Sequence, residues 1–254
     1  KLTLEDSYIS AKLPLIDCIK RGITTIIDHH ASPMHITGSL NRIADAVKET
    51  GLRSCLCYEL SDRDGEKTAQ EGIDENVNFI KRCQQEQDPH LKALFGLHAS
   101  FTLTDRTLEK AVMAAKDLNT GFHVHTAEAK SDQDYNEANF GMRVVERFHK
   151  FGVLGPNTIA AHCVHVNNKE IGLLAKTDTM VVHNPQSNMN NAVGIADIIK
   201  MTEKGVVVGL GTDAMTVNMF EELRVALWGQ HLSNENPCCG FMEALATLPF
   251  NNAK

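Results

Sequence analysis

The sequence lacks the features that mark membrane, nucleic-acid-binding and disulfide-stabilised proteins. No apolar run approaches the ~20 residues that a helix needs to cross a bilayer, and residues 1–12 lack the apolar core of a signal peptide. The net charge of −7 leaves no basic surplus, so we expect neither nucleic acid nor a membrane as partner. The 7 cysteines form no CxxC pair, which argues against a disulfide framework and favours a reducing, cytoplasmic compartment.

What the sequence does contain is enough apolar material for one large core. The chain has 254 residues, of which 43% are hydrophobic, and α/β barrels commonly run to ~250 residues as one domain. Short apolar runs, typical of strands buried on both faces, recur along the chain without low complexity or an exact repeat. The runs are Ile23–Ile27, Cys55–Tyr58, Leu91–Leu97, Phe122–Val124, Thr158–Ala161, Met180–Val182 and Val206–Leu210.

The segments between these runs predict amphipathic helices, because apolar residues recur in them at three- and four-residue spacing. Asp105 is a candidate N-cap, and Gly51 is a plausible helix stop. The helical patterns cover Leu40–Val47, Leu108–Leu118, Val144–Phe151, Glu170–Ala175 and Ile195–Met201, with Gly121, Gly152 and Gly205 at the ends of three of them.

Strict alternation of strand and helix predicts a parallel sheet, either open and doubly wound or closed into a barrel. The open sheet usually carries a glycine-rich turn after its first strand, and none is present here. A barrel places functional residues at the carboxyl ends of nearly all its strands, which is the pattern seen. We therefore predict a single (β/α)8 barrel domain over residues 1–254.

Reactive side chains gather at the ends of the predicted strands. One histidine at such a position is more often structural than a metal ligand, but a barrel would bring the whole set to one face. The set comprises Asp28, His29, His30, Glu59, His98, His123, His125, Glu128, His162, His183, Asn184, Thr212 and Asp213.

Some members of this set indicate a metal site, although each has a structural alternative. Imidazole at His125 suits zinc or iron, and Glu128 three residues later can move protons for a bound water or simply be a solvated acid at a helix N-terminus. Asp213 either binds a metal or caps the next helix, and the flanking Gly209 and Gly211 permit close backbone approach. His123 and His125 share one face of their strand, so by themselves they look like a ligand pair.

The motifs taken in order resemble the amidohydrolase superfamily over essentially the whole chain. They are His125-Thr-Ala-Glu128, Ala161-His162-Cys163-Val164-His165, Pro185-Gln186-Ser187-Asn188 and Gly211-Thr212-Asp213. The resemblance is strongest to the branch of triazine hydrolases, guanine deaminase-like enzymes and adenosine-type deaminases. The stretches 22–30 and 240–244 are most similar to the SsnA aminohydrolases.

This resemblance implies one divalent metal, zinc or else iron, and a role for each matching residue. His125 and Asp213 would be ligands, with Asp213 also taking a proton from water, and Glu128 would be the proton shuttle. His162 would lie beside the metal as a possible third ligand that holds water or substrate. His123 has no such role and would fill the barrel or support a ligand. The expected substrate contacts are His98, His183 and Asn184, with Tyr58 and Glu59 as weaker candidates.

The chain departs from the family pattern at its beginning. Family members end their first strand with an HxH motif that supplies two more ligands, whereas the first run here, Ile23–Ile27, matches their second strand. We therefore expect a chain that lacks the first strand and the small β-sandwich domain of the family. His29 and His30 are conceivable substitutes as ligands.

The expected activity is hydrolytic deamination of a small N-heterocycle with release of ammonia. One alternative keeps the site but expels chloride or an alkylamine, which an assay of the released group would distinguish. A second alternative is a non-catalytic scaffold, which an intact upstream HxH in the parent gene would exclude. Family analogy also suggests a homodimer.

Overall fold

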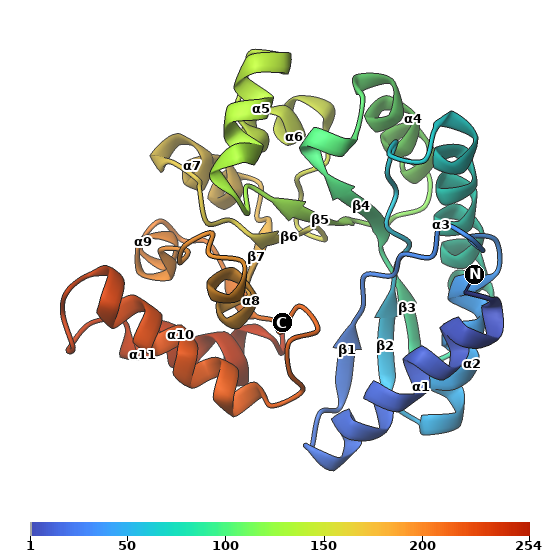
Figure 1. The fold of residues 1–254 in the computed structure, drawn as a ribbon, viewed down its shortest axis with the longest axis horizontal. Helices are drawn as coiled ribbons and strands as arrows, with labels where there is room; N and C mark the ends of the chain where they lie inside the picture. The colour runs from blue at the N-terminus through green and yellow to red at the C-terminus, as the bar shows by residue number, and fades with distance from the viewer. Residues whose placement is uncertain (1) are drawn as a thin grey trace. The chain divides into compact units, whose positions relative to one another are not determined.

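The computed structural model describes residues 2–254 and divides them into two compact units. The first unit ends at His123, and the second runs from Val124 to Lys254. Helices and strands alternate along both units (Figure 1). Within the described residues, no helix is both long and apolar enough to cross a membrane.

The first unit contains a parallel three-stranded sheet in the order β1-β2-β3, in which Ile26 is paired with Ser54 and Cys55 with Lys92. Helices α1 and α2 lie side by side along it (Figure 1). Its elements are α1 (Leu4–Lys20), β1 (Thr25–Ile27), α2 (Ser39–Thr50), β2 (Arg53–Leu56), α3 (Glu66–Glu86), β3 (Leu91–Ala93), β4 (Phe95–Ala99), η1 (Ser100–Thr102) and α4 (Asp105–Ala115).

Helix α2 forms for the reason its sequence predicts. Leu40, Ala44 and Val47 on its apolar face are completely buried, and burial of each large aliphatic side chain stabilises the fold by about 1.5–3 kcal/mol. Gly51 caps the helix in the left-handed region at φ 74°, which glycine adopts without steric cost.

Helix α4 differs from its prediction at both ends. The N-cap is Thr104, whose hydroxyl accepts the Thr107 N–H, so Asp105 is the first helical residue instead. The helix ends at Ala115, six residues before Gly121. Hydroxyl and carboxylate side chains are both good caps, so sequence alone does not separate two neighbours of this kind.

The second unit continues the alternation. Its strands follow one another as β5-β6-β7-β8, with Ala160 paired in parallel with Val181 and Val182 with Gly209. It begins within β5 (Phe122–Thr126) and continues with α5 (Lys130–Phe140), α6 (Val144–Phe151), β6 (Ile159–His162), α7 (Asn168–Lys176), β7 (Met180–His183), α8 (Pro185–Asn190), α9 (Ile198–Glu203), β8 (Val208–Leu210), α10 (Met219–Ser233), α11 (Phe241–Ala246) and η2 (Thr247–Asn251).

Each predicted apolar run overlaps a strand, and one run is divided between two strands. The Leu94 N–H bonds to the Leu56 carbonyl, whereas the Phe95 N–H bonds to the Gly121 carbonyl. The run over Leu91–Leu97 therefore changes hydrogen-bonding neighbours in its middle, which separates β3 from β4.

The glycines around β8 allow close approach, as their sequence context predicts. A Cβ atom on Gly211 would lie 2.3 Å from Asn184 Oδ1, and one on Gly209 would lie 2.5 Å from Asn252 Oδ1. Asn252 uses that space to accept the Leu210 N–H and to donate to the Leu210 carbonyl, each at 2.8 Å. The side-chain amide thus pairs with backbone groups of β8 as a neighbouring strand would.

Candidate metal centre

The second unit brings together the three side chains that the sequence nominates as metal ligands. His125 lies near the end of β5, His162 is the last residue of β6, and Asp213 follows β8. One ligand atom from each lies within 4.8 Å of the others. His125 is half-buried, His162 is buried and the Asp213 side chain is 37% exposed, so the cluster reaches from the interior to solvent.

The backbone turns sharply where these strands end. Five non-glycine residues just after β5, β6 and β8 or at their ends have left-handed φ angles, a conformation that costs of order 1–3 kcal/mol and persists only where the surroundings enforce it. Hydrogen bonds hold the turns after β5 and β6, because the Cys163 N–H bonds to the Thr126 carbonyl and the His165 N–H to the Ala127 carbonyl. The turn after β8 has a local bond from the Met215 N–H to the Thr212 carbonyl. The five residues are Ala127, His162, Cys163, Asp213 and Ala214.

His162 is held by one hydrogen bond and has an unpartnered ring nitrogen. Its Nδ1 lies 2.8 Å from Asn188 Oδ1, and both side chains are buried. Its Nε2 is buried without a hydrogen-bond partner and lies 3.6 Å from Glu128 Oε2 and 3.9 Å from Asp213 Oδ2. The rings of His162 and His125 are 5.5 Å apart, so a second imidazole borders the same space.

These residues fit a divalent cation. A buried imidazole nitrogen, a second imidazole and two carboxylates converge on one point, and their lone pairs repel one another unless positive charge lies between them. Two histidines and one aspartate are also a usual donor set for catalytic zinc, which takes three protein ligands and leaves a position for water. The orphaned Nε2 of His162 is the observation that tests this fit.

Helix α8 contacts the reactive carboxylates as well. Ser187 donates to Asp213 Oδ2 at 2.5 Å, and Asn191, which caps the helix, donates to Glu128 Oε1 at 3.1 Å. Ser187 and Asn188 belong to one of the four family-like motifs, but no role was predicted for them or for Asn191. The available signal was the mainly polar stretch 183–191 that follows the predicted strand Met180–Val182.

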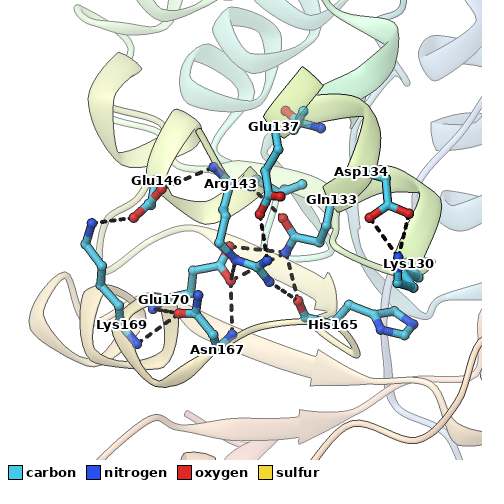
Figure 2. Close-up of polar contacts among 12 residues, drawn as sticks. Lys130, Gln133, Asp134, Glu137, Arg143, Glu146, His165, Asn167, Lys169 and Glu170 are labelled. Carbon is cyan, nitrogen blue, oxygen red and sulfur yellow. Dashed lines mark hydrogen bonds and ion pairs between the residues drawn. The ribbon is translucent and has the colours of Figure 1, made fainter. Parts of the chain in front are cut away.

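A buried ion pair supports the loop that follows β6 (Figure 2). Glu170 is fully buried and accepts from Arg143 Nε at 2.7 Å and from the Asn167 N–H at 3.0 Å. Arg143 and Gln133 also donate to the His165 carbonyl, at 2.7 and 2.8 Å. The loop that begins at His162 is therefore tied to α5, α6 and α7.

The two predicted substrate contacts in this unit are both buried. His183 is 0% exposed and neither of its ring nitrogens has a hydrogen-bond partner; burial, together with the nearby His162, lowers its pKa to about 3. Asn184 is the N-cap residue of α8, and its Oδ1 occupies the space over Gly211. A role of either residue in binding substrate stays a prediction.

The nominated histidines of the first unit have partners of their own. His98 Nδ1 lies 2.7 Å from Thr102 Oγ1, and burial lowers the His98 pKa to about 4. His29 Nε2 lies near the carbonyl oxygens of Leu97 and His123, and His30 Nε2 lies 2.9 Å from Ser32 Oγ. Their predicted roles, His98 in substrate binding and His29 or His30 as substitute ligands, stay predictions.

The fold and the cluster together define a class, the α/β proteins with a group of potential metal ligands at the carboxyl ends of parallel strands. The Amidohydrolase family model matches residues 2–254, and the chain belongs to that family. The predicted superfamily is thereby confirmed, while the particular similarity to SsnA aminohydrolases stays a prediction.

Two curated relatives and one solved structure illustrate the similarity. The chain is 33% identical over 240 residues to a 5-methylthioadenosine/S-adenosylhomocysteine deaminase of Desulforudis audaxviator, and 33% identical over 240 residues to a 5'-deoxyadenosine deaminase of Methanobrevibacter smithii. Each alignment covers 93% of this chain and 54% of the relative, so the chain spans about half the length of the curated relatives it matches.

The solved structure is an adenosine deaminase from Xanthomonas campestris with bound zinc. It superposes with a TM-score of 0.87 at 22% identity, over 97% of this chain and 56% of that one. At this identity the likeness shows the fold, and together with the family match it confirms the predicted barrel-type α/β class.

Proposed function

We propose that this chain carries part of the active site of a metal-dependent hydrolytic deaminase that releases ammonia from an N-heterocycle. The observation that carries the proposal is the convergence of His125, His162 and Asp213 within 4.8 Å, with Glu128 Oε2 3.6 Å from the orphaned nitrogen of His162. A non-catalytic scaffold has no need to keep a metal-type donor set beside a carboxylate positioned for proton transfer.

The position of each residue in the cluster suits it to a different step of the reaction. A divalent cation held by His125, Asp213 and His162, zinc being the first choice, would act as a Lewis acid that lowers the pKa of water toward ~7. Asp213 lies at the exposed side of the cluster, where its carboxylate can accept the proton of an attacking water. His162 lies at the buried side, where its ring can hold that water or the oxygen that develops negative charge.

Glu128 is suited to shuttle protons. Its side chain is 25% exposed, and one oxygen is held by Asn191 while the other faces the cluster. A carboxylate in this place can protonate a ring nitrogen, which makes the adjacent carbon more electrophilic, and can then protonate the departing amine. Each proton transfer requires the Glu128 carboxylate to stay within reach of the cluster. The hydrogen bond from Asn191 to Glu128 Oε1 keeps it there.

The names of the relatives support a narrower substrate class. Both are deaminases of adenine nucleosides altered at the 5' position. We propose such nucleosides as the first substrates to test, with the deaminated nucleoside and ammonia as products.

Glu128→Gln tests the proposal directly. In the full-length enzyme we expect the variant to keep its zinc and to release ammonia from 5'-deoxyadenosine at least ~10²-fold more slowly, because glutamine cannot carry the proton. Bound zinc is measured by plasma mass spectrometry and turnover by ammonia release.

Glu203→Gln is the matched control, since Glu203 is an exposed carboxylate at the end of α9. Unchanged turnover in Glu128→Gln would remove Glu128 from the mechanism. Release of chloride from a chlorinated triazine, without ammonia from any nucleoside, would favour the chlorohydrolase alternative.

A further inference from the structure

One short helix makes a hydrogen bond to each of three reactive groups in the cluster. Ser187 bonds to Asp213, Asn188 to His162 and the C-cap residue Asn191 to Glu128. We propose that α8 is the positioning element of this centre, and that Asn188 is its decisive residue because it fixes the tautomer of His162. This inference rests on the metal site of the proposed function and adds to it a residue that acts through a ligand.

The contact between Asn188 and His162 determines which ring nitrogen carries the proton. A neutral imidazole has one N–H and one lone pair, and the hydrogen bond at one nitrogen decides the state of the other. Asn188 Oδ1 is an acceptor, so the His162 nitrogen 2.8 Å away, Nδ1, must donate. Nε2 is then left with its lone pair.

The lone pair on His162 Nε2 faces the carboxylates of the cluster. Nε2 faces Glu128 Oε2 and Asp213 Oδ2 at 3.6 and 3.9 Å and has no hydrogen-bond partner. In this tautomer His162 can bind a cation or accept a proton, whereas the other tautomer could only donate to the carboxylates. A histidine ligand whose second nitrogen donates to an oxygen acceptor is the usual arrangement at protein metal sites.

The backbone of Asn188 is held in place, and its side chain is buried. The residue is 0% exposed, its N–H bonds to the Asn184 carbonyl, and its carbonyl accepts the Val193 N–H. The start of α8 is fixed by the buried Glu222 of α10, whose Oε1 accepts the Gln186 N–H at 3.2 Å. The side-chain Nδ2 is buried without a hydrogen-bond partner, so the backbone keeps the amide against His162 while the contact with Nδ1 orients it.

The opposite orientation of the Asn188 amide makes a different prediction. If its NH₂ group faced His162, Nδ1 would accept and Nε2 would carry the proton. The two arrangements therefore differ in an observable that requires neither substrate nor metal, namely which nitrogen of His162 is protonated in the neutral ring.

The experiment is 15N NMR of histidine side chains in the zinc-free chain at alkaline pH, where protonated and unprotonated ring nitrogens have well-separated shifts. His162→Gln identifies the signals of His162 among those of the 12 histidines. We expect protonated Nδ1 and unprotonated Nε2. Protonated Nε2 in the wild-type chain would overturn the proposal, whatever the variants do.

Two substitutions then test whether Asn188 is the cause. Asn188→Leu removes the acceptor at similar size, so we expect mixed tautomers and zinc affinity, measured by calorimetry, reduced about 10–100-fold. Asn188→Asp keeps an acceptor and should keep protonated Nδ1. Asn168→Ala, which changes an exposed asparagine at the start of α7, is the control and should match the wild type.

The outcomes separate this inference from the proposed function. A wild-type tautomer that persists in Asn188→Leu would overturn the role of Asn188 even if the enzyme deaminates nucleosides. Failure of every substrate to release ammonia would overturn the deaminase proposal and leave the NMR result standing. If Asn188→Leu is unfolded by circular dichroism, the wild-type and Asn188→Asp spectra still decide.

Discussion

Glu222 shows how one buried carboxyl links pH to stability. The side chain is 0% exposed, and burial raises its pKa to about 7, from the ordinary value of 4.5. The folded state therefore binds its proton more tightly than the unfolded state does. Stability from this group is complete below about pH 4.5 and is lost as the pH rises towards 7.

We expect Glu222→Gln to remove that loss, because glutamine is neutral at every pH and keeps a carbonyl oxygen for the Gln186 N–H. The free energy of unfolding of the variant relative to wild type should rise between pH 4.5 and 7, by at most ~1.4 kcal/mol per pH unit. Urea unfolding at several pH values measures it. Glu221→Gln is the neighbouring control, and parallel pH curves for Glu222→Gln and wild type would show that Glu222 does not titrate in this range.

The left-handed residues at the strand ends illustrate the limit of residue-level reasoning. His162 and Asp213 were nominated by chemistry, yet both adopt φ angles that side chains disfavour, 72° and 46°. The turn at His162 is held by a bond from the Cys163 N–H to the Thr126 carbonyl of the neighbouring strand, which the local sequence does not reveal.

Among the elements, α7 and α6 are joined by the ion pair of Glu170 with Arg143. Glu170 is buried and accepts four kinds of donor, including the Val145 N–H and Gln133 Nε2 (Figure 2). Such a pair is not strongly stabilising relative to apolar packing. Removal of Glu170, however, would leave Arg143 with only the exposed Glu137 as an ionic partner among the described residues. It would also take the acceptor from the Val145 and Asn167 N–H groups.

Glu170→Ala should therefore lower the free energy of unfolding by about 3–5 kcal/mol, as measured by urea denaturation. Lys130→Ala removes an exposed pair with Asp134 in the same region, and its cost should stay below about 1 kcal/mol. Equal effects of the two substitutions would contradict the assigned role of burial.

Element boundaries were predicted well where the local pattern is strong. Gly51 and Gly152 end α2 and α6 as expected, because a left-handed C-cap selects glycine. The start of α4 at Thr104 and the break between β3 and β4 depend on which neighbour receives each hydrogen bond. The choice of hydrogen-bonding neighbour depends on residues distant in the sequence, so the local pattern does not predict it.

For the whole molecule, the metal should couple binding to stability. On the proposed function, zinc would bind the folded cluster and not the dispersed ligands of the unfolded chain, so a free concentration 100 times Kd would add about 2.7 kcal/mol. For a chain of this size we expect Tm to rise by roughly 5–10 °C, measured by scanning calorimetry.

A chelator should reverse the rise, and His125→Ala or Asp213→Ala should abolish it. His149→Ala is the control, because His149 is an exposed histidine of α6. A full zinc-induced shift in Asp213→Ala would place the metal elsewhere.

The sequence by itself determined the alternation of buried strands and helices, the family, and three residues of the cluster. Short, β-branched apolar runs that alternate with helical patterns favour strands covered on both faces, and the order of the motifs is independent of any contact. Only the tertiary structure decided how those residues are held. Asn191 reaches Glu128 across 63 positions and Ser187 reaches Asp213 across 26, and His183 became a buried residue with a depressed pKa. The orientation, tautomer and pKa of a side chain depend on the atoms within a few ångströms of it. Those atoms come from distant parts of the sequence and are brought together only by folding.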